Sequence, residues 1–167
     1  MAIPKIMKNF HLLVDGHGYA GICDEVKLPD LKMKVDEHRA GGMDAPVPLE
    51  IGMEKLELGF TMAEHHPFIF RQYGLLNQNA VQCNFRGAVA DDVSVENYWI
   101  EVRGMYTELK LGTAKLGDKS KLEAVIGLRY FRLVRAGQEL LLFDIDNFVR
   151  IVNGVDQLEA MRAAMLL

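Results

Sequence analysis

Residues 16–21 of this 167-residue chain have the spacing of a dinucleotide-binding loop. Their sequence, GHGYAG, matches the pattern G-x-G-x-x-G, and Asp36 follows at about the distance expected of a ribose-binding acid. Such a site needs a helix that begins at the loop, because the first backbone N–H groups of the helix hold the pyrophosphate. Residues 22–29 are ICDEVKLP, and their β-branched residues and proline favour a strand and a turn. The sequence therefore predicts a hairpin turn at 16–21, with a small nucleotide-binding β-barrel enzyme as the alternative.

The sequence contains no comparable pattern for metal binding or for nucleophilic catalysis. The five histidines form no H-E-x-x-H motif, and residues 144–147 begin like a calcium loop but continue with Phe148 and Val149 where a ligand and a glycine are needed. No serine lies in G-x-S-x-G, and Cys23 and Cys83 lack a recognisable nucleophile context. We therefore predict no catalytic, cofactor-binding or metal-binding residue, no cofactor and no enzyme activity.

Composition is that of one globular domain, residues 1–167, with 50% hydrophobic and 25% charged positions. The net charge of -4 and the lack of a basic stripe argue against a protein that grips nucleic acid. No apolar run approaches the roughly 20 residues that span a membrane, and the first ten residues do not resemble a signal peptide. We expect no membrane anchoring, reduced thiols and synthesis in a cytoplasm.

The apolar pattern has mostly period two, which predicts strands. Residues 55–62 are the clearest case, and residues 31–36 repeat the alternation. Each is expected to have one buried and one solvated face. On the first strand the apolar positions are Leu56, Leu58, Phe60 and Met62, and the polar positions are Lys55, Glu57 and Thr61.

Two predicted strands are unusually long. In residues 95–111 the apolar parity changes after Gly104 to Met105, Leu109 and Leu111, which predicts a β-bulge or bend at the glycine. Residues 122–135 lead through a turn at 136–137 into a returning strand, 138–144. A 17-residue strand would reach about 55 Å, whereas the radius of gyration of a domain this size is about 15 Å. Bending, or extension beyond the body with edges that another chain covers, is therefore expected.

Two helices are expected beside the strands, which makes the fold mainly antiparallel β. Residues 66–74 begin near a proline and end at a glycine. At the C-terminal end, Asp156 is expected to cap a helix with Leu158, Met161 and Met165 along one side. That side either packs on its own domain or faces a partner, and we expect self-packing because apolar side chains need burial.

Residues 39–48, RAGGMDAPVP, are the most distinctive segment. Two glycines and two prolines exclude a strand or helix interior. The segment is either an ordinary exposed loop or a loop that docks on a neighbour, which the apolar residues Met43, Ala45 and Val47 favour.

With this segment the chain resembles the major tail tube protein of contractile-tailed phages and the similar tube of R-type tailocins. Five matching segments lie in the family's order, and segments such as 90–97 depart from it, so phage tail and tailocin both remain open. The segments are 9–16 (NFHLLVDG), 26–31 (VKLPDL), 39–46 (RAGGMDAP), 130–133 with 137–140 (YFRL, GQEL) and 153–158 (NGVDQL).

The resemblance implies a β-sandwich or partial barrel with a flanking helix, whose long strands complete a barrel between subunits. Hexameric rings would stack into a rigid tube that a contractile sheath drives through an envelope. Tape measure, baseplate and terminator proteins would be further partners, DNA would be only transient cargo, and the particle would assemble in a bacterial host. The expected ring-to-ring or intersubunit residues are Arg39, Ala40, Gly41, Gly42, Met43, Asp44, Ala45, Pro46 and Val47. The expected lumen residues are Lys55, Glu57, Thr61, Glu101 and Arg103. A secretion-system tube or a baseplate-hub subunit of the same fold is the alternative.

Overall fold

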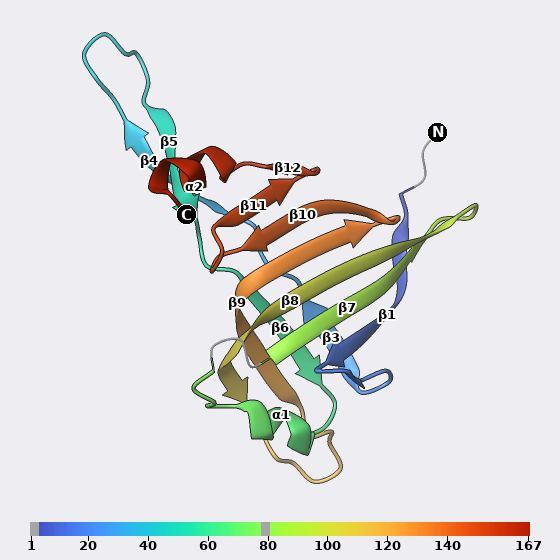
Figure 1. The fold of residues 1–167 in the computed structure, drawn as a ribbon. Coiled ribbons are helices and arrows are strands. Elements are labelled where there is room, and N and C mark those ends of the chain that lie inside the picture. The colour runs from blue at the N-terminus through green and yellow to red at the C-terminus, as the bar shows by residue number, and fades with distance from the viewer. Residues whose placement is uncertain (1–3, 78–80) are drawn as a thin grey trace.

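The computed structural model describes residues 4–77 and 81–167, and most of these residues lie in antiparallel strands (Figure 1). The helices are α1 (Pro67–Gln72) and α2 (Glu159–Met165). The strands are β1 (Ile6–Val14), β2 (His17–Gly18), β3 (Cys23–Lys27), β4 (Met33–His38), β5 (Val47–Met53), β6 (Glu57–Met62), β7 (Val81–Ala90), β8 (Val95–Lys110), β9 (Leu122–Arg135), β10 (Gln138–Asp144), β11 (Val149–Val152) and β12 (Val155–Asp156).

Strand β9 is the junction of a ten-stranded sheet. The main path has the order β12-β11-β10-β9-β8-β7-β1-β2, and β6 joins it at β9 with β3 on its far side. Along one edge, β9 pairs with β8. On its other edge the first half pairs with β6 and the second half with β10, and the change of partner falls at residues 128–129.

Strands β1, β7, β8, β9, β6 and β3 curl into a partial barrel around the hydrophobic core. Alternate residues of these strands point inward, as in Leu58, Phe60 and Met62 of β6, which are buried. This confirms the alternation predicted for residues 55–62. Ile69 of α1 and Tyr19 pack into the same core and close its end.

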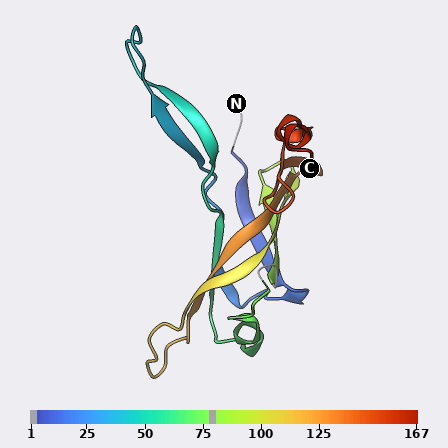
Figure 2. The ribbon, with the colours of Figure 1, turned by 60° about the vertical axis from the view of Figure 1, so that its left-hand side comes forward.

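The β4–β5 hairpin forms a separate two-stranded sheet that projects from the body as an arm, drawn in cyan (Figures 1 and 2). Strand β4 lies where the alternation of residues 31–36 predicts a strand, but its expected buried face is wrong for the single chain. Strand β5 was not predicted, and it includes Val47 and Pro48 of the segment for which a strand interior was excluded. Met33, Val35 and Leu49 are all exposed, because the arm extends beyond the core that would cover them. Its bare apolar residues need another surface.

The turn predicted at 136–137 is confirmed, whereas the hairpin turn predicted at 16–21 lies at 15–16, because residues 17–18 form β2. At 15–16 and at 136–137 both central residues have positive φ (46° and 81°, 49° and 78°), the conformation of a tight two-residue hairpin turn. Residues 16–21 therefore lead from β1 through β2 towards β3, and among the described residues no helix begins at this loop. The dinucleotide alternative lacks the helix N-terminus that it needs.

The bulge predicted at Gly104 is confirmed, but the predicted change of parity at Met105 is wrong. The register shifts between Arg103 and Gly104 because β9 carries an extra residue there. Tyr106 still points inward and is buried. The alternation changes only at the next bulge, at Thr107.

Helix α2 corrects the expectations about its cap and its packing. It begins at Glu159, with Leu158 at the N-cap, whereas Asp156 lies in β12. No residue of α2 is buried, and Met161 and Met165 are exposed. Self-packing is therefore wrong for the single chain, since no element of the described residues buries this side.

Neither described helix has the length and apolarity to cross a membrane. Within residues 4–77 and 81–167, no three His, Cys, Asp or Glu residues gather in a way that could hold a metal ion.

Candidate assembly surfaces

The tip of the arm carries the segment for which docking was predicted. Of residues 39–47, only Met43 is partly shielded, because it folds back against Ala40: the Met43 N–H donates to the Ala40 carbonyl at 3.2 Å. Gly42 has a φ of 89°, which permits this reversal of the chain. The whole segment therefore stands at the far end of the arm, free to touch another molecule.

Both faces of the arm carry exposed apolar side chains. Opposite Val35 lies Glu50, whereas Leu49 lies opposite Asp36 and Val47 opposite His38. Since neighbouring residues of a strand point to opposite faces, Val35 is on one face and Leu49 and Val47 are on the other. An arm that is apolar on both sides needs a covering surface on each side.

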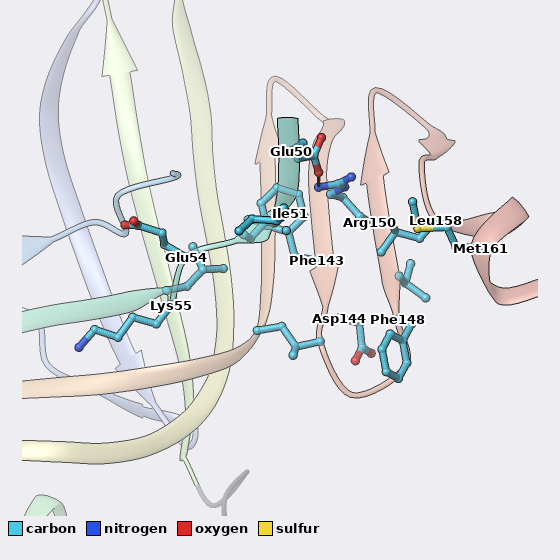
Figure 3. Close-up of a pocket in the computed structure, with 15 residues that line it drawn as sticks. Glu50, Ile51, Glu54, Lys55, Phe143, Asp144, Phe148, Arg150, Leu158 and Met161 are labelled. Carbon is cyan, nitrogen blue, oxygen red and sulfur yellow. Dashed lines mark hydrogen bonds and ion pairs between the residues drawn. The ribbon is translucent and has the colours of Figure 1, made fainter. Parts of the chain in front are cut away.

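An apolar groove of about 750 Å³ lies where the base of the arm meets β10, β11 and α2 (Figure 3). Four of its lining residues, Ile51, Ile145, Phe148 and Met161, are more than half exposed. Phe148 has a φ of 53°, in the left-handed region that is costly for a bulky residue. An open apolar cluster of this size is typical of a binding surface.

Two arginines hold the walls of the groove together. Arg150 Nη1 of β11 lies 2.6 Å from Glu50 Oε1 of β5, and this ion pair joins the arm to the sheet (Figure 3). Arg162 of α2 donates to Asp156 Oδ2 at 2.6 Å and to the Phe148 carbonyl at 2.6 Å. The Arg162 guanidinium, together with the Leu158 N–H, lowers the pKa of Asp156. Charged hydrogen bonds thus link the arm to β11, and α2 to β12 and to the turn before β11.

The predicted lumen residues on strands share the outward face of the partial barrel. Glu57 and Thr61 alternate with the buried residues of β6, and Glu101 and Arg103 alternate with the buried residues of β8. Lys55 precedes β6 and its Nζ lies 2.8 Å from Glu57 Oε1. The structure therefore brings this set to one face, whereas the arm tip lies far from it (Figure 1).

Opposite charges alternate on this outward face. Arg132 lies 2.6 Å from Glu139 and 3.8 Å from Glu101. The guanidinium carbon of Arg103 lies 4.0 Å from the centre of the Tyr130 ring. These basic side chains already contact an acid or an aromatic face, which reduces their attraction for further anions.

Both cysteines are free thiols, and their environments do not activate them. Burial raises the pKa of Cys23 to about 11 and raises that of the deeply buried Cys83 further. Because the thiolate is the nucleophile, the raised pKa values disfavour reaction of both groups at neutral pH.

A family model described as "Phage tail tube protein FII" matches residues 4–165. The chain belongs to this family. The Tail tube protein of Escherichia phage P2 is 30% identical over 167 residues, which cover 97% of each chain. The Major tail tube protein of Serratia phage KSP20 is 29% identical over 151 residues, 89% of this chain and 88% of the relative. A tube subunit of a contractile injection apparatus is the function that follows from this membership.

Solved structures share the fold of this tail tube chain. A sheath-tube complex of the PVC extracellular contractile injection system matches with a TM-score of 0.58 and 11% identity, over 81% of this chain and 93% of that chain. The sheath/tube terminator of the same system has a TM-score of 0.58 and 14% identity, over 81% and 98%. At these identities the likeness supports the fold alone.

Sequence reasoning missed the groove of this tube subunit. Arg150 and Glu50 are 100 positions apart, so nothing local marks them as partners. One signal was present: residues 145–148 form a turn that carries two exposed apolar side chains, Ile145 and Phe148, where polar residues are usual.

Proposed function

We propose that this chain, as one domain over residues 1–167, forms the inner tube of a contractile particle, a phage tail or a tailocin. Hexameric rings stack into a stiff hollow tube, and contraction of a surrounding sheath drives the tube through the target envelope. Sixfold symmetry is what the neighbouring AFP baseplate structure has, at a TM-score of 0.50. The role is structural and needs no catalytic residue.

The observation that carries this proposal is the arm with two apolar faces. A lone β-hairpin is at best marginally stable in water, and this one also exposes Val35, Val47 and Leu49. Two neighbouring copies, one on each face, would bury both sides. Repeated heterologous contacts of this kind close into rings or continue as stacks, and the long strands of the body would then complete a barrel between subunits.

Residues 39–47 at the arm tip make the contact between rings. Deletion of this segment, with an Asn-Gly turn in its place, is expected to leave the subunit folded and to shorten or abolish the tubes. Tubes of unchanged length from a folded variant would refute the docking role.

The outward face with Glu57, Thr61, Glu101 and Arg103 lines the lumen, and Lys55 stands at its edge. The basic side chains of this face already contact acidic groups or aromatic rings, which leaves little free positive charge. DNA in a phage would therefore pass through the lumen as transient cargo without binding. Changing Glu57 and Glu101 to lysine is expected to slow DNA delivery. Normal delivery by a phage with both substitutions would count against this assignment.

Sheath, tape measure, baseplate and terminator proteins complete the list of partners. The PVC relatives are described as sheath-tube and terminator structures, which supports the first and the last of these for this chain. Assembly is expected in the cytoplasm of a bacterial host, with no membrane anchoring.

Negative-stain electron microscopy of the purified chain across a concentration series tests the function. Rings or tubes with a central channel and sixfold top views are expected. Monomers alone up to the solubility limit, with and without a crowding agent, would contradict self-assembly. Rings with another symmetry would overturn the proposed hexamer but would still support the tube function.

A further inference from the structure

The loop between β8 and β9, residues 111–121, carries an exposed apolar side chain at its tip. Within it the Asp118 N–H donates to the Lys115 carbonyl at 3.2 Å, and Gly117 has a φ of 86°. This tight turn places Leu116 at its apex, where the side chain is fully exposed. A leucine held at the tip of a defined turn has the form of an anchor for a pocket.

The loop and the groove lie at opposite ends of the molecule. Figures 1 and 2 both show the loop at one end, beyond α1, and the arm base with α2 towards the other. In a head-to-tail stack, one end of a subunit meets the other end of the next subunit. The two surfaces are therefore placed to meet without any change of fold.

Charge also matches the loop to the groove. Residues 112–121 carry three lysines against one aspartate. Glu54 and Asp144 line the edge of the groove, and within the described residues neither carboxylate forms an ion pair. The competing occupant, the arm of a neighbour, fits less well. Apart from Glu50, which Arg150 holds, residues 33–53 carry three acids against two basic residues, so this arm would bring no net positive charge to the acidic edge, whereas the loop brings three lysines against one aspartate.

We propose that Leu116 of one copy seats in the groove of a second copy in the adjacent ring, between Ile51, Phe148 and Met161, with the flanking lysines against Glu54 and Asp144. This contact rests on the stacked-ring tube proposed above. It would cover the exposed side of α2 and the base of the arm at once. The groove volume is within the range of about 300–1,000 Å³ found for sites that enclose small ligands, so it accommodates the loop tip as well as the single side chain.

Cysteine cross-linking within assembled tubes tests the contact directly. The pair Leu116→Cys with Ile51→Cys is expected to give a ladder of oligomers under mild oxidation. The control pair Leu116→Cys with Val95→Cys, which is exposed but remote from the groove, is expected to give none. The native thiols are buried or half-buried, and each single variant measures the background.

A substitution at each of two equally exposed leucines separates docking from general solubility. Leu116→Asp is expected to lower the fraction of protein in sedimenting tubes by at least about tenfold, because the loop of each subunit would bring a charge into the apolar groove of the next. Leu76→Asp, at another fully exposed leucine, is expected to leave that fraction unchanged. Equal melting temperatures would show that both variants fold.

The outcomes distinguish the inference from the proposed function. If the wild type forms tubes but tubes of the Leu116→Cys, Ile51→Cys variant give no ladder, this contact is overturned and the tube is retained. Normal sedimentation of Leu116→Asp would have the same meaning. A ladder from Ala45→Cys with Ile51→Cys in its place would assign the groove to the neighbour's arm. Wild-type protein that forms neither rings nor tubes would overturn both.

Discussion

Arg150 and Glu50 form a 2.6 Å ion pair across the junction between β11 and the projecting arm. The Arg150 side chain is only 13% exposed, and it also lines the groove. The same guanidinium lies 3.8 Å from Met33 Sδ, and Met53 packs against the core of the body. The ion pair is therefore one of the contacts that hold the base of the arm, and the one with full charge.

Replacing Glu50 with glutamine should loosen the arm without unfolding the body. The lost charge weakens an ion pair that is partly exposed, so the free energy of unfolding should fall by no more than about 1 kcal/mol. Backbone amides of β4 and β5 should exchange faster in hydrogen-exchange mass spectrometry, while those of β8 stay protected. Glu57→Gln, at the exposed pair with Lys55, is the control. Unchanged exchange in the arm would show that the ion pair does not hold it.

Gly104 should tolerate no side chain. A Cβ at this position would lie 2.0 Å from the Gly127 carbonyl oxygen, where the backbones of β8 and β9 approach closely. Gly104→Ala is therefore expected to cost about 1–3 kcal/mol of unfolding free energy, the range of overpacked sites. In Gly59→Ala the nearest atom, Lys27 Cβ, is at 3.5 Å, and we expect no loss. Urea unfolding of both variants measures the contrast, and equal midpoints would contradict it.

Leu58 and Leu49 should separate folding from assembly. Leu58 is completely buried in β6, so Leu58→Ala should cost about 2–5 kcal/mol. Leu49 is half exposed on the arm, so Leu49→Ala should change monomer stability by less than about 0.5 kcal/mol. Thermal unfolding of the monomer and sedimentation of tubes measure the two properties. We expect Leu49→Ala to reduce sedimentation alone, and normal tubes would remove this residue from the interface.

Stability should depend on pH through Asp156. Its pKa is lowered in the folded chain, first by Arg162 and then by the Leu158 N–H. A carboxyl group of this kind stabilises the fold fully above its unfolded pKa, and the contribution is lost as the pH falls through its folded pKa. The advantage of the wild type over Asp156→Asn should therefore be constant from about pH 7 to pH 5 and shrink below about pH 4. Urea midpoints of both proteins across this range test the sign, and an advantage that grows in acid would refute it.

The strands of the body could be predicted because their pattern is local. In β6 each buried residue alternates with a partly buried one, and the apolar pattern of six residues suffices to identify the strand. The same alternation misled for β4, since it shows that Met33 and Val35 share a face but not which molecule covers that face. The apolar side of α2 misled for the same reason.

The irregularities could not be predicted from one strand. The glycine of β8 indicated the bulge at Gly104, but the extra residue that shifts the register is Arg129 of β9, in another part of the sequence. The ion pair between Arg150 and Glu50 is likewise non-local, because only the fold brings β5 and β11 together.

The junction at β9 has a mechanical consequence. This strand has hydrogen-bonded neighbours on both edges over most of its length, β8 on one and β6 followed by β10 on the other. Removal of β9 from the sheet must therefore break two ladders at once, the one with β8 together with the one with β6 or β10. A rod built from such units would bear an axial thrust through its backbone, with β9 the last part of each subunit to yield.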